Sequence, residues 1–224
     1  MKLLEVPFGI LRSPEDFFRE IQESHRIGEK ILGCLGASVV MFGLFGGIVG
    51  AYSGWEQSAS SAIKLPVLFG ATVLICLPTL YVASLLLGAK EHIGQVLALL
   101  SGTLAVTSVL LVSFAPVSAF FLMTSSDYQF FKLLNVFILL VSGSMGVRFF
   151  RRAMRTLWGE AAAAREKVLT SWILLYAFVG TQLGWTMRPF FGAPNAPFQV
   201  VRESQDNFYV DIARSVREVL SLGD

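Results

Sequence analysis

The sequence predicts an all-α membrane protein: a polytopic bundle of five transmembrane helices with a short amphipathic helix at each end. Five long apolar segments fill most of the 224 residues. None of them carries Asp, Glu, Lys or Arg at mid-depth. Charged residues make up only 15% of the chain, against about 25% in soluble domains. The mean hydropathy is +0.63, so apolar side chains facing lipid or other helices replace the missing charge.

The five segments divide the chain into three parts. A helix crosses the hydrocarbon with about 20 apolar residues, and the segments at 31–51, 65–87, 95–123, 133–147 and 168–187 approach or exceed this length. We therefore expect a cytoplasmic N-terminal amphipathic segment at 1–30, a five-helix transmembrane domain at 31–191 and an extracytoplasmic C-terminal segment at 192–224. The apolar stripe of 207–220 predicts an amphipathic helix in that last part.

The N-terminal segment contains a helix start. Ser13 is a candidate capping hydroxyl, and Pro14 suits the first helical position. The apolar face formed by Phe17, Phe18 and Ile21 allows two interpretations. The helix lies on the membrane interface, or it packs against the protein's own loops.

The first span is rich in glycine at G-x-x-x-G spacing. Small residues at this spacing allow helix backbones to approach closely in lipid. The candidate packing or oligomer interface therefore consists of Gly43, Gly46, Gly47, Gly50 and Gly54. The same pattern fits a contact between copies of the chain or close packing within one chain.

Two prolines predict irregular helices. Pro78 should kink the second span, with Thr72 and Thr79 placed to satisfy the freed carbonyl. The third segment has 29 residues, which is about 43 Å of helix against a hydrocarbon core of about 30 Å. The segment must tilt strongly, project beyond the membrane or break, and Pro116 is the expected position of a break. In the fourth span, Asn135 should bond to a neighbouring helix.

The end of the fifth span is the most polar part of the bundle. The candidate positions there are Thr181, Gln182, Trp185 and Arg188, after which Pro189 should stop the helix. Trp185 and Arg188 fit a membrane-interface anchor. In the alternative interpretation, the guanidinium of Arg188 holds the aromatic stretch 190–198 against the ends of the bundle.

The sequence contains no recognisable catalytic or metal-binding motif. His25 and His92 are isolated, and neither has the spacing of a metal ligand. No nucleophile and base are paired in the pattern of a known enzyme class. We therefore expect no enzyme, no cofactor and no metal. The net charge of +2 gives no reason to expect nucleic acid.

Three stretches, 64–69, 76–82 and 182–192, resemble a group of uncharacterised bacterial membrane proteins. The layout, a cytosolic N-terminal region followed by five helices, is similar to that of Yip1-type membrane proteins. The resemblance implies a bacterial inner-membrane protein that acts as a non-enzymatic adaptor. It carries over no defined active site.

These observations predict a scaffold, sensor or accessory subunit of a membrane complex. Its expected partners are membrane lipids and either copies of itself or other membrane-protein subunits. The alternative is an oligomeric channel or small passive transporter. In that case polar side chains would line a path, with Asn135, Ser142, Thr181 and Gln182 as the candidates.

The distribution of basic residues predicts that the N-terminus is cytoplasmic and the C-terminus outside. With this orientation, twelve Lys and Arg residues lie inside and six outside, as the positive-inside rule requires. Ser204→Cys, in a chain lacking Cys34 and Cys76, should react with an impermeant thiol reagent in intact spheroplasts. Labelling that needs lysis would contradict this topology.

Overall fold

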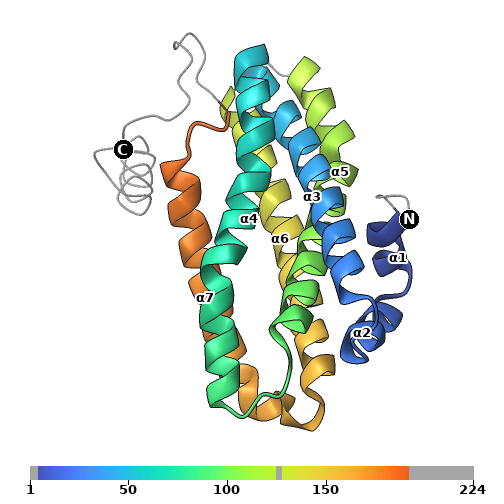
Figure 1. Ribbon diagram of the computed structural model, residues 1–224. Helices are drawn as coiled ribbons and strands as arrows, with labels where there is room; N and C mark the ends of the chain where they lie inside the picture. Colours follow the sequence, from blue (N-terminus) through green and yellow to red (C-terminus); the bar gives the residue numbers. More distant parts are fainter. Residues whose placement is uncertain (1–4, 125–127, 192–224) are drawn as a thin grey trace.

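The computed structural model describes residues 5–124 and 128–191, and all elements within these ranges are helical (Figure 1). The predicted C-terminal helix at 207–220 lies outside the described residues. The elements are α1 (Glu5–Arg12), α2 (Pro14–Gln22), α3 (Ile27–Gly50), the 3-10 turn η1 (Ala51–Ser53), α4 (Trp55–Leu86), α5 (Ile93–Thr124), α6 (Tyr128–Trp158), the 3-10 turn η2 (Gly159–Ala161) and α7 (Ala162–Thr186).

The five long helices α3 to α7 run alternately up and down (Figure 1). The start of α3 and the turns α4–α5 and α6–α7 lie together at one end, which we call the basic end. The α3–α4 turn and the end of α7 lie at the other, which we call the opposite end. This is the arrangement expected when short connections join antiparallel neighbours.

Four helical stretches are long and apolar enough to cross a membrane. The fourth, Phe130–Thr186, has 57 residues and contains both α6 and α7. These two helices fold back on each other at η2, where Gly159 has a φ of +54°, a conformation that glycine adopts without strain. The all-α membrane architecture is therefore confirmed, whereas five separate crossings stay a prediction.

Helix α5 forms the axis of the bundle. In its most apolar window 72% of the residues are buried, against 28–39% in the other three stretches. The predicted break at Pro116 was wrong, because α5 continues unbroken through it. Proline removes one backbone hydrogen bond, whereas an interruption in lipid would leave several backbone groups without partners. Continuing the helix is therefore the less costly solution.

The N-terminal helices pack against the long helices rather than against loops. The ring of Phe17 fills the space beside Gly102 of α5, where an added Cβ would lie 2.7 Å from the ring. The side-chain amide of Gln95 donates to the carbonyl of Ile21 at the end of α2, at 3.0 Å. Ser13 precedes Pro14 as predicted, but its hydroxyl makes no capping hydrogen bond.

An ion pair closes the contact between α2 and α3. Lys30 Nζ lies 2.5 Å from the Glu20 carboxylate, while the Lys30 side chain is almost entirely buried. The hydrogen bond from Lys30 lowers the pKa of Glu20. The N-terminal segment is thus fixed to the bundle by apolar, hydrogen-bonded and ionic contacts.

The glycines of the first span serve the contact between α3 and α4 of one chain. Gly46 lies against the backbone of Ser61, and Gly50 lies against the backbone of Gln57. A Cβ at either glycine would collide with a main-chain carbonyl of α4. The close approach therefore requires glycine at both positions.

The other glycines of the pattern have different surroundings. Gly43 faces the carbonyl of Ala62, at 3.3 Å from an added Cβ. The carbonyl of Gly47 accepts a hydrogen bond of 2.8 Å from the Ser58 hydroxyl. Gly54 has open space around it and a φ of +110°, so it forms the turn between the helices instead of a packing face.

We predict that Gly46→Ala/Gly50→Ala lowers the free energy of unfolding by about 1–3 kcal/mol, because the added methyl groups force the two backbones apart. The matched control is Gly70→Ala/Gly143→Ala, since an added Cβ meets nothing within 4 Å at either position. Both variants can be compared by reversible unfolding in mixed detergent micelles. Equal stabilities of the two double variants would contradict this packing.

Candidate functional site

The densest polar cluster of the spans lies at the opposite end, where the chain leaves α7. Four side chains, which we call the carbonyl clamp, donate hydrogen bonds to the backbone of residues 189–191: Ser53, Gln57, Ser61 and Lys64. Gln57, Ser61 and Lys64 follow at i, i+4 and i+7 along α4, which places them on one helix face. Ser53 lies in η1, before the turn at Gly54.

Two of these donors converge on Phe190. The Gln57 amide nitrogen lies 3.3 Å from the Phe190 carbonyl oxygen, and the Ser61 hydroxyl donates to the same oxygen at 2.5 Å. Gln57 also donates to the Pro189 carbonyl at 2.8 Å. These carbonyls follow the end of α7, so no backbone N–H of α7 is available to donate to them. In apolar surroundings they need donors from elsewhere, and the clamp supplies them.

The remaining donors complete the clamp on both sides. Lys64 Nζ donates to the Pro189 carbonyl at 3.0 Å and lies 5.9 Å from the centre of the Phe190 ring. The Ser53 hydroxyl donates to the Phe191 carbonyl at 2.8 Å. Every carbonyl from 189 to 191 therefore has a donor on η1 or α4.

The position of Lys64 corrects the sequence analysis, which began the second span at residue 65. Helix α4 begins at Trp55, so Lys64 lies about two and a half turns inside it. Lys64 is only 6% exposed. Residues 55–64 lay outside the apolar segments because this stretch contains several polar residues. Gln57 and Lys64 direct their polar atoms at the backbone that follows α7, which allows a helix to continue through a polar stretch.

The candidate positions on α7 do not form the clamp. The guanidinium carbon of Arg188 lies 3.5 Å from the centre of the Trp185 ring, which is a cation–π contact. The Thr181 hydroxyl bonds to the Phe178 carbonyl of its own helix at 2.8 Å. Within the described residues, the side chain of Gln182 makes no hydrogen bond. The donors to Phe190 and Phe191 come from α4 and η1, not from Arg188; residues 192–198 lie outside the described part.

Asn135 connects α6 with α5. It is fully buried, its amide oxygen accepts from the Ser118 hydroxyl at 2.7 Å, and its nitrogen donates to the Phe131 carbonyl at 2.9 Å. A buried amide with both ends bonded stabilises the contact between two helices in lipid.

Helix α7 forms a hydrogen bond to α4 close to Pro78. Thr72 was predicted to satisfy the carbonyl freed by this proline, but its hydroxyl donates to the Leu68 carbonyl at 2.7 Å. Leu68 lies one turn before Thr72, within bonding reach of its hydroxyl. The carbonyl that Pro78 deprives of its helical donor is that of Leu74. The Trp172 indole nitrogen donates to a neighbouring carbonyl, that of Cys76, at 2.8 Å. Sequence analysis did not single out Trp172, because nothing in its local pattern indicates its partner.

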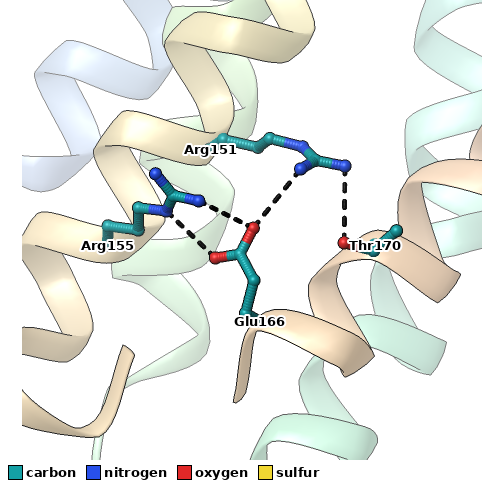
Figure 2. A network of polar contacts seen from close by, with 4 residues as sticks. All are labelled: Arg151, Arg155, Glu166 and Thr170. Atoms are coloured by element: carbon teal, nitrogen blue, oxygen red, sulfur yellow. Dashed lines mark hydrogen bonds and ion pairs between the residues drawn. The ribbon is translucent and has the colours of Figure 1, made fainter. Parts of the chain in front are cut away.

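The basic end holds a second polar network, which connects α6 with α7 across their turn. Figure 2 shows the guanidinium groups of Arg151 and Arg155 directed at the carboxylate of Glu166. Arg155 binds both oxygens of this carboxylate, at 2.9 and 3.0 Å. Arg151 binds Glu166 at 3.3 Å and Thr170 at 3.4 Å. Arg151 and Arg155 of the basic run thus form specific contacts with α7.

A buried ion pair joins the α4–α5 turn to α7. Arg165 lies 3.2 Å from the Glu91 carboxylate, and both side chains are largely buried. The guanidinium also donates to the Leu87 carbonyl at 3.4 Å. Breaking a buried pair leaves an uncompensated charge, so this contact fixes the relative positions of the two turns.

These polar contacts join helices and turns to one another, and none of them forms a recognisable catalytic or metal-binding arrangement within the described residues. Within residues 5–124 and 128–191, no three His, Cys, Asp or Glu side chains gather as a metal site would require. Cys34 and Cys76 are free thiols in that part of the chain, and both are buried. No protein-family model, curated protein or solved structure matches this chain.

We predict that Gln57→Leu lowers the free energy of unfolding by about 1–3 kcal/mol, because buried carbonyls lose a donor. Gln182→Leu is the matched control, since the same change on α7 removes no hydrogen bond within the described residues. Thermal unfolding followed by circular dichroism would compare them. A control variant as unstable as Gln57→Leu would show that the clamp contributes nothing specific.

Proposed function

We propose that this protein is a non-enzymatic scaffold or accessory subunit of a membrane complex, acting through protein and lipid contacts. In this proposal α3, α4, α5, α6 and α7 each cross a bacterial inner membrane. The N-terminus lies in the cytoplasm and the C-terminus outside.

One observation carries the proposal: three buried polar side chains of the long helices each pair with a neighbouring segment. Asn135 pairs with Ser118, Trp172 with Cys76, and Gln57 with the backbone that follows α7. A channel requires polar groups that share one continuous path. Separate pairs between adjacent helices are instead what close packing in lipid requires.

The surroundings of the α3 glycines limit where a partner chain can bind. Gly46 and Gly50 are occupied by α4 of the same chain, so a second chain has no room at those positions. In the proposal, partners and copies of the chain therefore contact other faces. Such faces include the exposed apolar side of α4 around Ile63 and Leu74.

Water access distinguishes a scaffold from a channel. We expect Ser118→Cys and Asn135→Cys, in a chain lacking native cysteines, to resist a small water-soluble methanethiosulfonate reagent in liposomes, because both positions are fully buried. Trp55→Cys is the positive control, since Trp55 is 79% exposed. Modification of residues 118 and 135 at the rate of the control would contradict the scaffold and favour the channel.

A further inference from the structure

One face of α6 changes from apolar to basic along a single stripe. The positions follow the spacing i, i+4, i+7, i+11, i+15, i+18 and i+22, so they lie on one side of the helix. They are Leu133, Phe137, Leu140, Ser144, Arg148, Arg151 and Arg155. The first three side chains are 62–67% exposed, and in a membrane such apolar exposure faces the lipid tails.

In the proposed membrane arrangement, the basic part of this stripe reaches the headgroup layer. Arg148 is eight residues beyond Leu140, which is about 12 Å along the helix axis. Long basic side chains at the end of an apolar helix face reach into the headgroup layer. The apolar part of the stripe therefore suits the acyl chains of a phospholipid, and the basic part suits its phosphate.

The basic part is also hollowed. Arg148, Arg151, Arg152, Arg155 and Thr156 line an open hollow of about 550 Å³. Guanidinium groups suit phosphate because their planar forks donate two parallel hydrogen bonds to its oxygens.

The hollow has an excess of positive charge. Two of its guanidinium groups share Glu166, and Arg152 pairs with Glu15 of α2. Four guanidinium groups thus face two carboxylates. Arg148 is exposed and has no ion-pair or hydrogen-bond partner in the described part of the chain. It remains available for an anion.

We propose that this hollow binds the phosphate of an anionic phospholipid, whose acyl chains lie along the exposed apolar part of α6. Two features favour a lipid over a soluble phosphate: the hollow continues directly into the apolar stripe, and its charge excess lies at headgroup depth. Basic pockets at this depth are favourable sites for anionic headgroups. This lipid site does not depend on the proposed scaffold function, because its residues all belong to α6 of a single chain.

Native mass spectrometry of the purified full-length protein in detergent tests the proposal. The probes are dioctanoyl phosphatidylglycerol and dioctanoyl phosphatidylcholine, which share acyl chains and differ in net charge. We expect the anionic lipid to bind at least about tenfold more tightly, and Arg148→Gln to remove about tenfold of its affinity. Binding of phosphatidylcholine should stay unchanged.

Lys90→Gln is the matched control, because Lys90 is an exposed cation at the same end of the bundle. It should change phosphatidylglycerol affinity by no more than about twofold. Arg148→Lys, which keeps the charge but loses the fork, should bind less tightly than the parent and more tightly than Arg148→Gln. Circular dichroism confirms folding of each variant.

Three results would overturn the proposal. The first is equal affinity for the two lipids. The second is an equal loss in Arg148→Gln and Lys90→Gln, which would indicate general charge attraction. The third is displacement of the lipid by equimolar inorganic phosphate or glycerol 3-phosphate, which would assign the hollow to a soluble phosphate. Retention of the lipid in their presence supports the lipid source.

Discussion

A polypeptide in lipid must satisfy its own backbone hydrogen bonds, and the arrangement of this protein follows from that constraint. Regular helices meet it everywhere except where a helix ends or contains proline. The end of α7 is such a place, because three successive carbonyls leave the helical pattern there. The carbonyl clamp supplies donors to all three from η1 and α4, so the last described segment is fixed to the second long helix.

The same constraint explains the other buried polar contacts. Gln95 binds carbonyls at the end of α2, and Trp172 binds a carbonyl of α4 beside Pro78. Each contact joins elements that are distant in sequence. Helix α5, which is surrounded by other elements, provides the axis on which they assemble. The buried polar groups thus specify which segments meet, while apolar packing and close glycine contacts hold them together.

The sequence predicted the fold class because apolar length is a direct consequence of membrane thickness. It also pointed to the close approach at Gly46 and Gly50 and to the bond between Asn135 and a neighbouring helix. It could not identify the clamp, since Gln57 and Lys64 become meaningful only with residues 189–191, which lie 125 or more positions away. Local polarity instead suggested that 55–64 was outside the helix. The helical spacing of the polar residues Gln57, Ser61 and Lys64 was the one local pattern that could have indicated that the helix begins before residue 65.

Pro116 illustrates a second limit. Proline propensity predicted a break, but propensity is measured where water can bond to the freed groups. Packing around α5 and the absence of water favour an unbroken helix. The basic run after residue 147 entered the sequence analysis through the positive-inside rule, and its orientation stays a prediction. Its pairing with Glu166 depends on the fold-back at Gly159. Tertiary contacts of this kind are not encoded in any local pattern.

Disulfide trapping in native membranes tests most directly whether the segment after α7 is held on η1 and α4. Ser53→Cys/Phe191→Cys, in a chain lacking Cys34 and Cys76, should cross-link rapidly within one chain on mild oxidation, because the Ser53 hydroxyl lies 2.8 Å from the Phe191 carbonyl. Trp55→Cys/Phe191→Cys is the matched comparison, since the Trp55 side chain is 79% exposed. Cross-linking of the 53/191 pair well ahead of the comparison pair is the predicted result. Equal or absent cross-linking of the two pairs would contradict the account.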